Sequence, residues 1–230
     1  MNFLEICRQV ADRCNVSGVI AGTVDQTGDH ARVVRRVNDA WLEIQQSSDI
    51  WRFMRKRFEF NTVAGKPNYT VPLVTESIKP GGLSAIRRYM FETRSAACWP
   101  LGNKAGRTFL GLWEFSDYED AFIYGVTQPG APSVLAVDES DTIWLGSIPD
   151  GIYTVSGTVQ LAASLLVAST DIPVMPEEFH MAIVYLAAMK IAATDNLPEV
   201  YSEADAGYKQ VWGALDRTEK EPVTWGDPLA

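Results

Sequence analysis

The chain has 230 residues, of which 47% are apolar and 21% are charged. This length and composition suffice for a large folded core and exclude an intrinsically disordered chain. The net charge of -9 disfavours tight, sequence-independent binding to DNA, since such binding needs many lysines and arginines on one face.

Charge is distributed unevenly along the chain. Residues 1–110 contain 16 Lys and Arg against 10 Asp and Glu, whereas residues 111–230 contain 4 against 19, so the two parts carry +6 and -15. Two interpretations stay open. In one, the basic surface of one copy binds the acidic surface of the next, because complementary potentials speed association and fix register. In the other, the uneven surface charge has no function.

The first predicted helix spans residues 2–15. Asn2 is a suitable N-cap, and Glu5 follows at the spacing of a capping box. The expected buried face consists of Phe3, Cys7, Val10 and Cys14.

The three cysteines form no disulfide pattern. Cys7 and Cys14 would lie about two helical turns apart, roughly 10 Å, which is too far for a disulfide, and Cys98 has no cysteine near it. We expect small core residues in a reducing compartment. Residues 1–6 lack the pattern of a secretion signal.

Two further helices carry apolar stripes that need a partner. One begins at a predicted cap, Asp29, and ends at residues 47–49; the other ends near Arg217. The stripes are Val33, Val34, Val37, Trp41 and Ile44 in the first, and Tyr201, Ala204, Tyr208, Val211 and Leu215 in the second. Neither helix can bury its stripe alone, so we expect helices from both ends of the chain to share a core.

Four basic residues lie within or just after residues 50–54, a segment that contains two aromatic side chains. They are Arg52, Arg55, Lys56 and Arg57. On a helix, Arg52, Arg55 and Lys56 would share one side. They would then contact a phosphate or a partner, or they would form a solvated helix end whose cations suit the macrodipole.

The middle of the chain predicts strands and turns. Residues 58–63 and 68–71 read as a hairpin around residues 64–67, and residues 85–92 read as a strand that carries Arg87 and Arg88. Residues 116–124 predict a short capped helix that Gly125 ends. Three further runs predict a meander: 133–137, 142–146 and 152–160.

The helix predicted for residues 179–194 is apolar almost all round, so we expect it at the centre of the helical part. Pro176 precedes it at a position that suits a helix start. The apolar run at residues 161–168, which Ser164 interrupts, is far shorter than the roughly 20 residues that span a bilayer, so no membrane contact is expected.

These elements predict an α+β fold. Residues 1–55 and 174–218 form a helical bundle, residues 56–173 form a β-rich insertion, and residues 219–230 form an extended tail.

No catalytic, cofactor or metal set is recognisable. His30 and His180 stand far from other ligand residues, and no glycine-rich loop suits a phosphate. The only candidate catalytic side chains are carboxylates, either Asp117, Glu119 and Asp120 or Glu177 and Glu178. They are compatible with a glycan hydrolase, for which Trp99 and Trp113 would line a sugar site. Alternatively, the acids lie at helix ends, and the tryptophans belong to a core or an interface.

The tail contains a large aromatic residue without a local core. Trp225 would either fill a pocket of a partner or fold back on its own domain. The predicted partner-binding residues are Pro222, Val223, Thr224, Trp225, Pro228 and Leu229.

Helix caps, turns and core positions occur in a characteristic order at residues 3–7, 28–29, 37–45, 51–54, 60–65, 69–72, 130–132, 148–153 and 176–180. In this order the chain resembles the head-to-tail adaptor, or connector, proteins of tailed bacteriophages, especially those of short-tailed phages. The resemblance is weakest over residues 73–112.

The resemblance implies a structural protein of the virion neck, synthesised in the host bacterial cytoplasm, rather than an enzyme. It implies a ring, in such families typically of twelve copies, that docks beneath the portal and carries the tail or nozzle. The C-terminal extension would reach the portal, and DNA would pass through the ring unread until its ejection. Arg52, Arg55, Lys56, Arg57, Arg87 and Arg88 are candidate subunit or partner contacts. There are two alternatives: a virion-associated glycan hydrolase that uses Asp117, Glu119 or Asp120, and a tail-side or stopper ring protein of the same neck.

Overall fold

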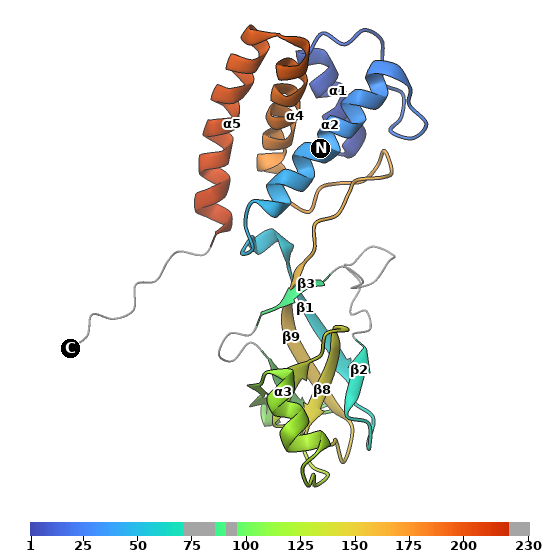
Figure 1. Ribbon diagram of the computed structural model, residues 1–230, viewed down its shortest axis with the longest axis vertical. Helices are drawn as coiled ribbons and strands as arrows, with labels where there is room; N and C mark the ends of the chain where they lie inside the picture. The colour runs from blue at the N-terminus through green and yellow to red at the C-terminus, as the bar shows by residue number, and fades with distance from the viewer. Residues whose placement is uncertain (71–85, 91–95, 221–230) are drawn as a thin grey trace, which may run out of the picture. The chain divides into compact units, whose positions relative to one another are not determined.

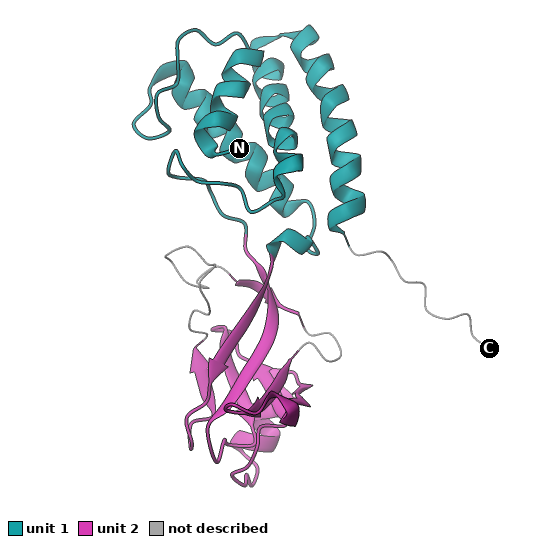
Figure 2. Cartoon of the chain, turned by 180° about the vertical axis from the view of Figure 1, so that it is seen from behind, with its two compact units in different colours: residues 1–54, 163–230 teal, residues 55–162 magenta. Residues whose placement is uncertain are grey.

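The computed structural model describes residues 1–70, 86–90 and 96–220 (Figure 1). Helices and strands both contribute, so the α+β class is confirmed. The chain forms two compact units, shown in Figure 2. The first comprises residues 1–54 and the described residues from 163 onward, and the second comprises residues 55–162.

The first unit is helical. Its helices are α1 (Phe3–Arg13), α2 (Gly28–Gln46), α4 (His180–Asp195) and α5 (Pro198–Glu219), with short 3-10 turns η1 (Arg52–Met54) and η4 (Glu177–Phe179). Helix α4 packs against each of the other three helices. Consecutive residues such as Ala182, Ile183 and Val184 point to different sides of the helix and are all buried, so the prediction of a central buried helix is confirmed.

The start of α1 follows the predicted capping box. The Asn2 side chain accepts a hydrogen bond from the Glu5 backbone N–H, and the Glu5 carboxylate accepts one from the Asn2 backbone N–H, each at 2.9 Å. The predicted cap of α2 is wrong. Thr27 occupies the N-cap, and Asp29 lies in the first turn, where its carboxylate pairs with Arg32 at 3.3 Å. A carboxylate is favourable at either place because the first turn also carries the positive end of the helix dipole.

The two predicted stripes meet in one core through α4. All five predicted positions of α2 are buried or half-buried, and on α5 Ala204 and Leu215 are buried. Tyr201, the first predicted stripe residue of α5, is 42% exposed. Near the other end of α5, Trp212 lies edge-on to Trp51, with ring centroids 5.6 Å apart. Residues far apart in sequence therefore complete a single core.

Side-chain amides of α2 hold the segment that enters the unit before α4. The Gln45 side chain donates to the Ser164 carbonyl and accepts from the Ser164 N–H, both at 3.0 Å. Asn38 does the same with Leu166, at 3.0 and 2.9 Å. Positions 38 and 45 lie about two helical turns apart on one side of α2, so they pair with alternate residues of an extended segment.

The second unit consists mainly of strands. They are β1 (Arg55–Asn61), β2 (Asn68–Thr70), β3 (Ile86–Tyr89), β4 (Ala97–Pro100), β5 (Thr108–Phe109), β6 (Gly111–Leu112), β7 (Val134–Val137), β8 (Thr142–Gly146) and β9 (Tyr153–Leu161). Short helical turns lie between them: η2 (Lys104–Gly106), α3 (Phe115–Tyr118) and η3 (Glu119–Ile123). The predicted short helix at residues 116–124 is thus present, although its N-cap, Glu114, makes no side-chain capping bond.

The described strands form two sheets. Sheet A has the order β1-β9-β4-β5, with β3 also paired to β9, and sheet B has the order β2-β8-β7-β6. The predicted hairpin is wrong, because β1 pairs with β9 and β2 pairs with β8. The predicted meander holds for β7 and β8 only, since β9 belongs to the other sheet.

The core of the second unit lies between the sheets. Phe58 and Val155 of sheet A and Ile143 of sheet B belong to one buried cluster. Gly157 of β9 lies opposite Phe58 of β1, and the Phe58 ring fills the space that a Cβ atom at residue 157 would occupy. A side chain at this position would displace a buried ring, which explains a glycine inside a strand.

Candidate partner-binding surfaces

Sheet A has an outer face, turned away from the core between the sheets. Side chains alternate along β1, so Phe58 and Phe60 enter the core while Arg57 and Glu59 are exposed on the outer face. The Arg57 Nε donates a hydrogen bond to Ser156 Oγ of β9 at 3.2 Å. The neighbouring strand therefore holds the stem of an exposed arginine in place.

A hollow on this outer face gathers cations and an aromatic ring. We call it the basic hollow; its lining residues are Arg57, Glu59, Trp99, Lys104, Ala105 and Arg107. The Lys104 Nζ lies 5.6 Å from the Trp99 ring centroid, and the Arg107 guanidinium lies 4.9 Å from the centroid of Phe109. These cation–π contacts orient exposed cations without neutralising them. Within the described residues, none of the three cations of the hollow forms an ion pair.

The strand pairings bring two predicted contact residues together. Arg55 of β1 and Arg88 of β3 both lie opposite Gln160 of β9, so the three residues form one rung across sheet A. Lys56 belongs to the next rung, beside Val159, and Arg87 stands at an irregularity of β3. Register places side chains of one rung on the same face.

The helical interpretation of this basic segment is wrong for most of its residues. Arg52 lies in η1 of the first unit, and the strand β1 begins at Arg55. The exposed Arg57 and Glu59 alternate with buried Phe58, which is the pattern of a half-buried strand. Arg52 therefore belongs to the first unit, whereas Arg57 belongs to the second.

The predicted tail contacts, Pro222, Val223, Thr224, Trp225, Pro228 and Leu229, lie outside the described residues. The chain is described up to Lys220, one residue after the end of α5. The Lys220 ammonium pairs with Asp216 and lies 5.3 Å from the centroid of the Trp51 ring. The last described residue is thus held beside Trp51.

The candidate catalytic carboxylates lie on the surface of a helix. Asp117 and Asp120 are exposed and Glu119 is half-buried, while Tyr118 and Phe122 of the same segment pack against sheet B. A glycosidase needs two carboxyl groups that flank a bound sugar. The exposure of Asp117 and Asp120 favours a surface role for these two acids.

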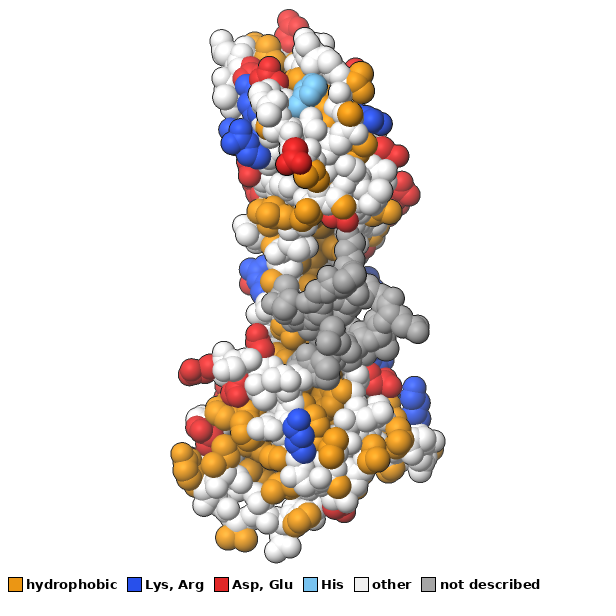
Figure 3. Space-filling view, turned by 90° about the vertical axis from the view of Figure 1, so that its right-hand side faces the viewer, with side chains coloured by type: hydrophobic (Ala, Val, Ile, Leu, Met, Phe, Trp, Pro, Cys, Tyr) orange, Lys and Arg blue, Asp and Glu red, His pale blue; other side chains and the backbone are white. Residues whose placement is uncertain are grey.

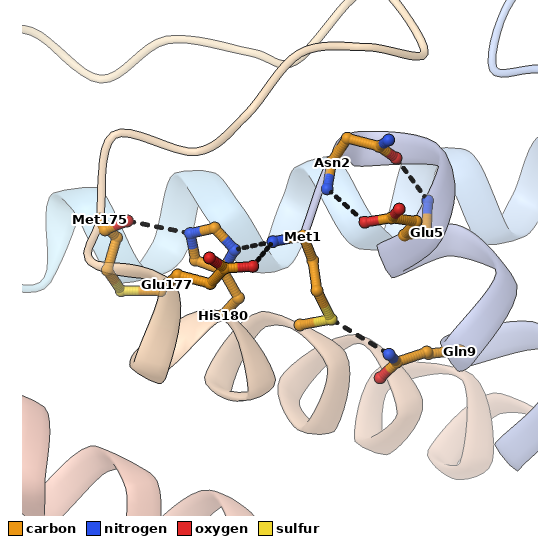
Figure 4. A network of polar contacts seen from close by, with 7 residues as sticks. All are labelled: Met1, Asn2, Glu5, Gln9, Met175, Glu177 and His180. Atoms are coloured by element: carbon orange, nitrogen blue, oxygen red, sulfur yellow. Dashed lines mark hydrogen bonds and ion pairs between the residues drawn. The ribbon is translucent and has the colours of Figure 1, made fainter.

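Glu177 and His180 belong to a polar network at the N-terminus (Figure 4). The Met1 ammonium lies 2.7 Å from Glu177 Oε1 and 3.0 Å from His180 Nδ1. The other ring nitrogen, Nε2, lies 2.9 Å from the Met175 carbonyl oxygen. Burial lowers the pKa of His180, and the Met1 charge acts in the same direction against the opposing influence of the Met175 carbonyl and Glu177. The hydrogen bond from the Met1 ammonium, with its charge, lowers the pKa of Glu177. The network thus joins the start of the chain to the start of α4.

The lowered pKa of His180 predicts a loss of stability in mild acid. Below its ordinary value of 6.5, the unfolded chain binds a proton at this histidine that the folded chain does not. The free energy of unfolding should therefore fall as the pH is lowered through this value. Urea titrations across this pH range measure the slope. The lowered pKa of Glu177 affects stability in a separate pH range, below its ordinary value of 4.5.

The chain offers a control for this prediction in its second histidine, His30, which is half-buried and whose Nε2 lies 3.0 Å from the Ser17 carbonyl oxygen. The variant His180→Gln should lose most of the slope between about pH 7 and pH 5, and His30→Gln should keep it. A slope that survives in His180→Gln would assign the acid sensitivity to other groups.

Metal and thiol chemistry find no support in the part of the chain that the structure describes. There, no cluster of three His, Cys, Asp or Glu residues could hold a metal ion. Burial raises the pKa of the Cys7 thiol to about 12, which keeps this cysteine protonated and unreactive. Nor does any helix in residues 1–70, 86–90 and 96–220 combine the length and apolar character needed to cross a membrane.

Sequence reasoning missed the basic hollow as a unit. Lys104 and Arg107 stand in a segment without periodicity, and the sequence offers a sugar site, a core or an interface for Trp99. The useful signal was the spacing of cations around an aromatic residue, with Lys104 five residues and Arg107 eight residues after Trp99. Lys104 and Arg107 line one hollow with Arg57 because of strand pairing that the sequence does not specify.

One comparison with known proteins covers almost the whole chain. A family model described as SU10 adaptor protein matches residues 1–229. No curated protein matches the chain. The family match includes both units and the segment over which the sequence resemblance was weakest.

Proposed function

Because the chain belongs to the SU10 adaptor protein family, a family of phage head-to-tail adaptors, we propose that its copies form a ring that links the portal to the tail. The family places the protein among the structural components of the virion. The match over residues 1–229 is the observation that carries the proposal. In its finer form, the ring contains twelve copies, docks beneath the portal and carries a tail or nozzle protein of a short-tailed phage.

The surface of the chain supports a role in assembly. Exposed cations lie over aromatic rings in the basic hollow, and exposed acids lie on α3 and η3. Large apolar side chains are also exposed on the second unit, among them Tyr124 at 77% and Val126 at 94%. Figure 3 shows one face of this unit, which is rich in hydrophobic side chains. Exposed apolar groups beside charges are typical of surfaces that bind other proteins.

Passage of DNA fits the charge of the chain. A channel wall that gripped phosphates would release counterions and hold the genome, whereas an acidic wall repels it. The net charge of -9 and the 19 acidic residues in the second half favour a ring through which DNA passes without being read. Synthesis in the host bacterial cytoplasm and release of the DNA through the neck during ejection complete the proposal.

The tail supplies a test of portal docking. Deleting residues 221–230, which leaves the Lys220 contact with Trp51 in place, should weaken binding to purified portal protein. If Trp225 is the anchor, Trp225→Ala alone should cost at least about 2 kcal/mol, or roughly thirtyfold in affinity. Co-sedimentation of the full chain with portal measures this.

A chain with the order of residues 221–230 scrambled is the matched control, because it keeps the length and composition of the tail. It should bind as weakly as the deletion. Undiminished docking by the deletion variant would remove the tail from the mechanism, while leaving other docking surfaces to be identified on the two units.

A further inference from the structure

The second unit is built in layers that separate its basic surface from its acidic surface. Sheet A and sheet B enclose one core between them. On the far side of sheet B, Tyr118 and Phe122 pack with Val134 and Trp144 in a separate cluster. The order is therefore outer face of sheet A, core, sheet B, and then α3 with η3. The outer face and α3 lie on opposite sides of the same unit.

Charge differs between the two parts of the sequence that form the unit. Residues 55–110 contain ten Lys and Arg against three Asp and Glu, a balance of +7. Residues 111–162 contain eight Asp and Glu and no Lys or Arg, a balance of -8. The unit as a whole is thus nearly neutral at -1, although its two sequence parts carry opposite charge.

The outer face presents its cations in an ordered way. Arg57 is held by Ser156, and Lys104 and Arg107 lie over aromatic rings. Phe109, the ring beneath Arg107, is itself 43% exposed. One acid, Glu59, also lines the hollow. The balance of the hollow is positive, and the cations have little conformational freedom to lose when a partner binds.

The opposite side presents acids and apolar groups together. Glu114, Asp117 and Asp120 are exposed, because the aromatic side chains between them turn toward sheet B. Within the described residues, none of these three forms an ion pair. Next to them, Ile123 is 44% exposed, as Tyr124 and Val126 are to a greater degree. We call this surface the acidic helix face.

We propose that the basic hollow of one copy binds the acidic helix face of a second copy, so that the second units associate front to back. The inference rests on the proposed ring and identifies the surfaces that form it. Opposite charges align the two copies, and the exposed rings and aliphatic groups of both surfaces become buried. Because the two surfaces differ and lie on opposite sides of one unit, the contact is heterologous, and heterologous contacts generate rings when the rotation closes.

A second copy fits the hollow better than DNA does. Non-specific DNA binding depends on a run of cations that neutralises many phosphates. The hollow offers three cations and places Glu59 among them. An acidic helix with a few carboxylates matches this small number, and every copy of the chain carries one.

Charge reversal tests the contact with full-length protein. A front variant changes the basic hollow and carries Arg57→Glu, Lys104→Glu and Arg107→Glu. A back variant changes the acidic helix face and carries Glu114→Lys, Asp117→Lys and Asp120→Lys. All six side chains are exposed, so both variants should fold, which circular dichroism verifies. Assembly is measured by sedimentation with purified portal protein, and by self-association in its absence.

Each variant alone should assemble at least about tenfold more weakly than the unchanged chain, since like charges then face each other. An equimolar mixture of the two should recover assembly, because in an alternating arrangement every contact again joins opposite charges. Higher salt should weaken assembly of the unchanged chain.

The outcomes separate this inference from the proposed function. If the unchanged chain assembles on portal and both variants do so equally well, or if the mixture is no better than either variant, the front-to-back contact is wrong and the ring stands. If the unchanged chain does not assemble at all, the proposed function is wrong and the contact falls with it. Binding of a short DNA duplex that only the front variant loses would assign the hollow to nucleic acid instead.

Discussion

Replacing Trp51 with alanine should lower the free energy of unfolding of the helical unit by about 3–5 kcal/mol, the range for removing a large aromatic side chain from a core. Trp51 is 0% exposed. Its ring lies 5.4 Å from the centroid of Phe53 and 5.6 Å edge-on from Trp212. Its Nε1–H donates to the Ile44 carbonyl oxygen at 2.8 Å. The variant loses packing at the meeting point of η1 and α5 together with a buried hydrogen bond.

Two further variants separate these contributions. Trp51→Phe keeps a ring and removes the indole N–H, so it should cost less than the alanine variant. Tyr201→Ala removes an aromatic ring from α5 that is 42% exposed, and it should change the free energy of unfolding by less than about 1 kcal/mol. Urea titration followed by circular dichroism compares the three. Equal losses for Trp51→Ala and Tyr201→Ala would contradict the assignment of Trp51 to the core.

Replacing Gln45 with leucine should destabilise the same unit by about 2–4 kcal/mol, although leucine has a similar size. Gln45 is 1% exposed, and its amide bonds both the N–H and the carbonyl of Ser164. Leucine leaves both backbone groups without these partners, and each such group costs about 1–3 kcal/mol when it stays buried. The loss should also free the segment before α4, which hydrogen exchange at Ser164 and Leu166 would detect.

The adjacent Gln46 is the matched control, because it is exposed on the same helix. Gln46→Leu makes the same chemical change without breaking a contact to the segment before α4, so it should leave stability within about 0.5 kcal/mol. Similar effects of both substitutions would show that the Gln45 amide does not hold this segment.

The helices could be predicted from sequence because their signals are local. The capping box of Asn2 and Glu5 and the stripe of α2 lie within a few turns of the residues they organise. The circumferential burial of α4 follows from a sequence that is apolar on every side. That α2 and α5 share a core could be inferred because neither can bury its stripe alone, although it is α4 that joins them.

Strand partners could not be predicted in the same way. Alternation in β1 correctly indicates which side chains enter the core, but it does not indicate which strand lies beside it. The turn residues between β1 and β2 predicted a hairpin, whereas the chain passes there from sheet A to sheet B. The turn with Asp150 and Gly151 likewise leads from β8 of sheet B to β9 of sheet A. Turn chemistry defines a reversal of direction and leaves the pairing open.

The candidate surface was partly predictable for the same reason. Arg55, Arg57 and Arg88 were identified as cations without a catalytic role. Their common location depends on β9, which pairs with β1 and β3 and lies about 70 or more residues away in sequence. Lys104 and Arg107 join the surface because β4 also pairs with β9. The uneven charge of the two sequence halves left open whether complementary surfaces exist, and this stays a prediction.

We expect the two units to have different tasks. Helices from both ends of the chain form one core, and the last described residue, Lys220, lies beside Trp51 of that core. The two sheets hold the basic hollow and the acidic helix face apart on the second unit. In the proposed ring, surfaces on the second unit would bind identical neighbours, and a separate surface would bind a different protein.

The most direct test is electron microscopy of the purified full-length chain, alone and mixed with purified portal protein. The account predicts closed rings of the chain, twelve copies each, stacked on the portal along a common axis. A chain that stays solitary in the presence of portal and tail proteins would contradict it.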